Sequence, residues 1–98
     1  MATFISTVKF TQKGIEAVRD TSKRAAAFKV AAKKMGSKVT AIYWTLGYFD
    51  GVIIFEAPDD ETAAAAMMQL SGLGNVHTTT ARAFDAGEID KVVAKLGK

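Results

Sequence analysis

The pattern of hydrophobic and polar residues predicts four strands and three helices along this chain. Residues 2–10 alternate and are rich in Phe, Ile, Thr and Val, which is typical of a half-buried strand. Residues 39–46 and 52–57 are mostly β-branched or aromatic, and only the short turn 47–51 separates them. Because the connection is so short, we expect these two strands to pair antiparallel. Residues 76–84 form the fourth predicted strand.

Helical spacing of apolar residues appears between these strands. A short helical turn is expected around residues 15–19, and a longer helix over residues 21–35 with Thr21 or Ser22 as its N-cap. Residues 63–70 are strong helix formers that follow Pro58 and three acidic residues. Proline stops the preceding strand, and negative charge suits the start of a helix.

The C-terminal segment predicts one more helix, which ends near Leu96. Asp85 and Glu88 have the spacing of a capping box, in which each side chain accepts from the backbone of the other residue. We expect the apolar side of this helix to face inward. That side consists of Ile89, Val92, Val93 and Leu96.

The resulting βαββαβ order, with an added C-terminal helix, is the ferredoxin-like α+β arrangement in a single domain of residues 1–98. Both crossovers carry a helix, so both helices should cover one face of a four-stranded antiparallel sheet. Strict alternation places Val39 with Tyr43 on one face and Trp44 on the other, without saying which face is covered. In the next strand Val52 and Ile54 oppose Ile53 and Phe55.

Both faces of these central strands are therefore apolar. A monomer would leave a contiguous apolar sheet face in water, which monomeric proteins rarely tolerate. The simplest cover is a second copy related by a two-fold axis. We therefore expect a homodimer or a higher homo-oligomer.

Composition narrows the class of protein. Among the 98 residues there is no cysteine, and 49% are hydrophobic, which is typical of a globular domain. No apolar run approaches the ~20 residues of a membrane helix, and the N-terminus does not resemble a signal peptide. We expect a soluble, cytoplasmic protein without a membrane partner.

Charge is unevenly distributed. Residues 1–38 carry nine Lys or Arg and two acids, whereas residues 39–98 carry four basic and eight acidic residues. Four of the basic residues fall on the solvent side of the helix 21–35: Lys23, Lys29, Lys33 and Lys34. Phe4, Phe10 and Phe55 could stack on bases, but the motif of single-stranded RNA-binding sheets is absent, so we do not expect nucleic-acid binding.

Four residues are candidates for chemistry: His77, Arg82, Tyr43 and Asp50. His77 is the only histidine, and it could be a general base, a haem ligand or a half-buried structural residue, which we favour. Arg82 could bind an anion or pair with Asp50 or Glu56. Asp50 most simply closes the hairpin through hydrogen bonds to the backbone. No metal site or cofactor is expected, because there is no second histidine and the acids lack ligand spacing.

The hairpin and its surroundings carry a family resemblance. The segment 47–50 reads Gly-Tyr-Phe-Asp and is followed by Val-Ile-Ile-Phe-Glu-Ala-Pro-Asp-Asp in 52–60. Together with Gly-Ile at 14–15, Arg-Asp at 19–20 and Leu-Gly-Asn-Val at 73–76, it resembles the GYD domain family. The resemblance implies a dimeric α/β barrel in which two ferredoxin-like sheets enclose a shared interior. Phe49 stands where the family's Gly-x-Tyr-Asp pattern has tyrosine.

Two functions follow as hypotheses. The first is a small-molecule-binding or stress-related module with an apolar pocket between its sheets. The alternative is a cofactor-independent isomerase, cyclase or monooxygenase that acts on a small apolar or aromatic molecule through the four candidate residues. The barrels that the resemblance brings in include monooxygenases, lactone isomerases and haem-handling enzymes, and a shared fold does not choose among them.

Overall fold

The computed structural model of the protein describes residues 1–97. Its centre is one antiparallel sheet with the strand order β2-β3-β1-β4. The strands are β1 (Ala2–Phe10), β2 (Lys38–Trp44), β3 (Gly51–Ala57) and β4 (Val76–Ala83). This order confirms the ferredoxin-like α+β arrangement, and β2 ends two residues earlier than the sequence predicts.

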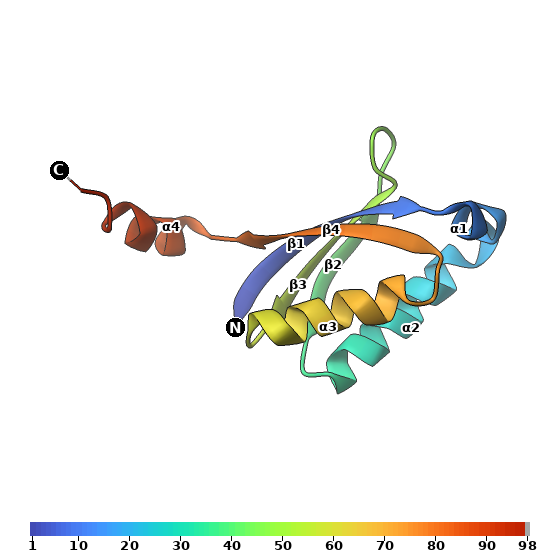
Figure 1. The fold of residues 1–98 in the computed structure, drawn as a ribbon, viewed down its shortest axis with the longest axis horizontal. Coiled ribbons are helices and arrows are strands. Elements are labelled where there is room, and N and C mark those ends of the chain that lie inside the picture. Colours follow the sequence, from blue (N-terminus) through green and yellow to red (C-terminus); the bar gives the residue numbers. More distant parts are fainter. Residues whose placement is uncertain (98) are drawn as a thin grey trace.

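The two longer helices, α2 (Thr21–Lys34) and α3 (Asp60–Ser71), lie on the same side of the sheet, as predicted (Figure 1). The short helix α1 (Gln12–Glu16) and a 3₁₀ turn (Val18–Asp20) connect β1 to α2. The last helix, α4 (Ala86–Val93), follows β4. None of the helices within residues 1–97 is both long and apolar enough to cross a membrane.

The starts of these helices differ in how they are capped. Asp59 caps α3 by accepting a hydrogen bond from the Thr62 N–H at 2.7 Å. The prediction that Thr21 or Ser22 caps α2 is wrong, because the N-cap residue is Asp20 and its side chain makes no capping bond. The Thr21 hydroxyl instead accepts from Trp44 Nε1 at 3.0 Å, which ties α2 to β2.

The core lies between the sheet and the helices α2 and α3. Phe4 of β1 and Phe55 of β3 face each other across the strands and stack, with ring centroids 5.4 Å apart. Ser6 is fully buried beside them and accepts a hydrogen bond from the Thr80 hydroxyl at 3.0 Å. The other buried apolar residues are Val8, Phe28, Ala32, Ile53, Ala57, Ala63, Ala66 and Met67.

Strand β2 does not alternate strictly. Its register against β3 shifts between Val39 and Ala41, so that Val39 pairs with Phe55 and Ile42 with Ile53. Val39 therefore shares the helix-covered face with Ile42 and Trp44, and the predicted pairing of Val39 with Tyr43 on one face is wrong. A bulge of one residue reverses the side-chain alternation that precedes it.

The opposite face of the sheet, here called the open face, has no helix over it (Figure 1). Register and alternation place six central residues on it: Ile5, Thr7, Tyr43, Val52, Ile54 and Ala81. Ile5 is 39% exposed and Tyr43 is 61% exposed. The sequence therefore predicted correctly that one apolar face of the sheet stays uncovered in a single chain.

Helix α4 lies beyond the end of the sheet and away from the rest of the chain (Figure 1). None of its residues is buried, and Ile89, Val92, Val93 and the following Leu96 are 42% to 71% exposed. The prediction that these side chains face inward is therefore wrong within one chain. Their spacing shows that the helix has an apolar side, but spacing does not say which chain covers that side.

Candidate functional site

The helix-covered side of the sheet contains an apolar cleft of about 220 Å³, between α2, the C-terminal end of α3 and the sheet. Its walls come from Ala25 and Phe28 of α2, Ile42 and Trp44 of β2, and Leu70 of α3. This cleft lies on the opposite side of the sheet from the pocket that the sequence predicts. That pocket needs a second sheet over the open face.

Arg24 brings a positive charge to this cleft. Its Nη1 donates a hydrogen bond to the Ala17 carbonyl oxygen at 2.8 Å, whereas its Nη2 is buried and has no acceptor among residues 1–97. The same part of the chain offers Arg24 no carboxylate within ion-pair distance. A buried donor without an acceptor costs free energy, so this nitrogen is an unsatisfied hydrogen-bond donor that needs an explanation.

Asp50 and Tyr43 also border the cleft. Asp50 Oδ2 accepts a hydrogen bond from the Phe10 N–H at 2.8 Å, and its own N–H donates to the Val8 carbonyl at 2.8 Å. Asp50 therefore fastens the base of the hairpin to β1, rather than closing the hairpin turn. The register places the Tyr43 side chain on the open face, and its neighbour Trp44 under α2.

His77 lies outside the lining of the cleft. It is exposed, pairs with Lys9 across β1 and β4, and lies on the open face. It therefore shares a face with Tyr43, although the two residues belong to the opposite edge strands β4 and β2. Residues 1–97 hold no group of three or more His, Asp or Glu side chains that could bind a metal ion.

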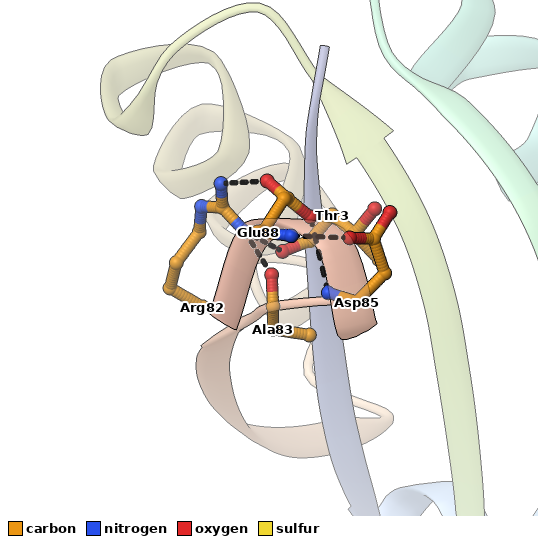
Figure 2. Close-up of polar contacts among 5 residues, drawn as sticks. All are labelled: Thr3, Arg82, Ala83, Asp85 and Glu88. Atoms are coloured by element: carbon orange, nitrogen blue, oxygen red, sulfur yellow. Dashed lines mark hydrogen bonds and ion pairs between the residues drawn. The ribbon is translucent and has the colours of Figure 1, made fainter. Parts of the chain in front are cut away.

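Arg82 forms hydrogen bonds at the junction between β4 and α4 (Figure 2). Its Nη2 donates to Glu88 Oε2 at 2.8 Å, and its Nη1 donates to the Ala83 carbonyl. The prediction that Arg82 pairs with Asp50 or Glu56 is therefore wrong. The capping box of α4 holds Glu88 close to Arg82. In this box Asp85 Oδ1 accepts from the Glu88 N–H, and Glu88 Oε1 accepts from the Asp85 N–H.

This junction should respond to acid. The hydrogen bond from Arg82, followed by that from the Asp85 N–H, holds the pKa of Glu88 below its ordinary value. A lowered pKa means that the ionised form stabilises the fold above the ordinary pKa, and that this contribution is lost as the pH falls through the lowered value. We expect the amide signals of α4 in NMR spectra to move toward unfolded positions over that acid range. In a Glu88→Gln variant they should already be shifted at neutral pH. An α4 that stays helical to the acid limit in the parent protein would contradict this.

Comparison with known proteins identifies the family. The family model described as "GYD domain" matches residues 4–93. The chain belongs to the GYD domain family. A GYD relative, the "Glutamine synthetase and cystathionine beta-lyase binding protein" of Thermus thermophilus, is 32% identical over 90 residues, covering 91% of this chain and 95% of the relative.

A solved structure supports the GYD fold. The crystal structure of TTHA0845 from Thermus thermophilus matches with a TM-score of 0.57 at 23% identity, over 88% of this chain and 96% of that one. At this identity the likeness shows the shared α+β fold alone.

The structure explains why the residues of the GYD hairpin favour its conformation. Gly47 has a φ of +128°, which a residue with a side chain rarely adopts. Thr45 closes the loop, since its hydroxyl donates to the Phe49 carbonyl at 2.6 Å and its N–H donates to the Asp50 carbonyl at 2.9 Å. Tyr48, at the tip, is 86% exposed and has Lys9 Nζ 4.5 Å from its ring centre.

Substitution of Asp50 tests whether its side chain holds the base of the hairpin to β1. Asp50→Ala leaves the Phe10 N–H without its charged acceptor, and should lower the free energy of unfolding by about 1–3 kcal/mol. Asp50→Asn keeps an acceptor oxygen and should lose less than half as much. Urea denaturation of the three proteins measures both differences. Equal midpoints for the parent and Asp50→Ala would show that this hydrogen bond does not hold the hairpin to β1.

Sequence reasoning missed Arg24 and the cleft itself. The sequence pattern placed four lysines on the solvent side of this helix and assigned Arg24 to neither side. Its position four residues before Phe28 was the available signal, because residues i and i+4 lie on the same side of a helix. Phe28 is in the core, so Arg24 had to lie at the edge of the apolar side.

Proposed function

We propose that this GYD protein is a cytoplasmic, homodimeric binding protein that associates with enzymes of metabolism. The observation that carries the proposal is the likeness to the "Glutamine synthetase and cystathionine beta-lyase binding protein", which extends over nearly the full length of both chains. Because the likeness spans both chains, a shared binding role is the first function to test. The whole chain, residues 1–98, acts as one domain in this proposal.

The homodimer rests on two uncovered apolar surfaces. One is the open face, with Ile5, Tyr43 and Val52 at its centre, and the other is the exposed side of α4. Monomeric proteins seldom expose contiguous apolar patches of this kind. In a two-fold dimer each chain offers the same surface to the other, so one contact between copies covers the open face of both.

The outer side of α2 stays available for an enzyme when the open face is covered. It carries four exposed lysines: Lys23, Lys29, Lys33 and Lys34. They belong to α2, which lies on the opposite side of the sheet from the proposed dimer contact (Figure 1). A concentrated positive surface attracts an acidic partner surface and speeds association, with an effect that falls as salt rises.

Direct binding tests the proposal. Purified glutamine synthetase and cystathionine β-lyase from the same genome would be immobilised separately, and this protein would be titrated over them at low and high salt. We expect micromolar or tighter binding to at least one enzyme. Lys29→Glu with Lys33→Glu should weaken it strongly, whereas Lys91→Glu with Lys95→Glu, which changes net charge equally, should not. No binding to either enzyme would contradict the proposal.

A cofactor-independent enzyme acting on a small apolar molecule is the second candidate. It is supported by His77 and Tyr43, which lie on the same open face and would both border an interior enclosed by two sheets. Native mass spectrometry that finds a bound small molecule in the parent protein, and none in His77→Ala, would favour this candidate. Ligand-free spectra of both proteins would count against it.

A further inference from the structure

We propose that the cleft beneath α2 is a binding site for a small organic carboxylate with an apolar body, and that Arg24 binds the carboxylate. This site goes beyond association with enzymes, because it lies on the helix-covered side of the sheet and needs no protein partner. It is also separate from the interior that two sheets would enclose.

The size and the walls of the cleft define the body of the ligand. Its volume is about 220 Å³, whereas an apolar cavity of about 150 Å³ is large enough to hold benzene. A single ring, or a branched chain of similar size, fits with room for a short polar group. Phe28, Ile42 and Leu70 supply apolar contacts, and ligand sites typically combine such walls with a few polar groups.

Arg24 defines the polar end of the ligand. The side chain lines the cleft, and its buried Nη2 lacks an acceptor within the described residues. A carboxylate is the group that matches a guanidinium best, because it accepts from two parallel N–H donors. Nη2 is buried in the unliganded protein, so a ligand can reach it only if the guanidinium turns toward the cleft.

The charge of Asp50 determines in which orientation the ligand binds. Its carboxylate borders the same cleft and is held by the Phe10 N–H. Its negative charge repels an anion, so the ligand carboxylate lies at the α2 end and the apolar body lies along the sheet. Besides Trp44, the other polar residues in the lining are of uncharged types: Thr21, Tyr43, Gln69 and Asn75.

Trp44 makes the proposal directly measurable. It is the only tryptophan, it lines the cleft, and its Nε1 donates to Thr21 of α2. Fluorescence titration of the purified full chain would use three probes with the same body: 3-phenylpropanoate, its neutral amide, and 2-phenylethylamine. We expect saturable changes with the acid at millimolar concentrations or below, an affinity for the amide about tenfold lower or weaker, and no saturation with the amine.

Two variants assign the effect to Arg24. Arg24→Gln should lower the affinity for the acid about tenfold or more and remove its advantage over the amide. Arg19→Gln makes the same change at an exposed position outside the lining and should leave the affinity unchanged. Equal binding of the acid and the amide to the parent protein, which requires no variant to fold, would overturn the proposal. So would an unchanged affinity in Arg24→Gln, or the absence of any saturable response to the acid.

Discussion

Replacement of Ile54 by Asp should convert the proposed dimer into monomers without unfolding the chain. Ile54 lies on the open face in the middle of β3, between β1 and β2, where it pairs with Ile5 and Ala41. A dimer through this face would bury two unpaired carboxylates, one from each copy. An uncompensated buried charge costs about 3–5 kcal/mol, so the dissociation constant should rise at least about a hundredfold.

Analytical ultracentrifugation over a dilution series measures this change. Val30→Asp is the matched control, because Val30 is an exposed apolar residue on α2, outside the open face. We expect it to leave the association unchanged. Equal dissociation constants for Ile54→Asp and the parent would show that the open face is not the contact between copies.

Truncation of Phe55 should cause the largest loss of stability. Phe55 is 1% exposed and stacks on Phe4 at the centre of the core. Phe55→Ala removes a buried ring and leaves a cavity, which typically costs about 3–5 kcal/mol of unfolding free energy. That is a large share of the roughly 5–15 kcal/mol that stabilises a typical domain.

Urea denaturation at one fixed protein concentration measures the loss, since the stability of a dimer depends on concentration. Met68→Ala is the matched control, because Met68 is 73% exposed on α3. It should change the free energy of unfolding by less than about 0.5 kcal/mol. A loss at Phe55 no larger than that at Met68 would mean that the core between the sheet and the helices is misassigned.

The sequence carries most of the fold because its signals are local. Alternation in residues 2–10 and the apolar run that begins at residue 52 mark the two central strands, and the spacing of Asp85 and Glu88 marks the start of α4. Gly14 is an example of a residue whose role could not be predicted from local signals. A Cβ there would lie 1.9 Å from the Asn75 carbonyl oxygen, so glycine is required by a contact with a residue far along the chain. Such a requirement cannot be seen until the chain has folded.

The features that sequence reasoning missed depend on long-range geometry. The bulge after Val39 changes which side chains of β2 face the helices, and no local pattern announces it. Arg82 has several acids within reach along the sequence, and only the path of the chain after β4 selects Glu88. The apolar side of α4 was recognised, but nothing within residues 1–97 of a single chain covers it.

The candidate site was less predictable than the fold. The four residues chosen by type do not converge, since His77 and Tyr43 lie on the open face, Asp50 at the hairpin base and Arg82 beside α4. Residue type identifies groups that can do chemistry, whereas a site also needs an enclosed volume. The cleft at Arg24 arises from the packing of α2 and α3 on the sheet.

Native mass spectrometry of the purified parent protein, at micromolar concentration and on dilution, tests most directly whether a second copy covers the open face and α4. We expect an even number of chains, with twice the chain mass as the smallest stable species. A single chain with a fully folded circular dichroism spectrum at the same concentration would contradict it.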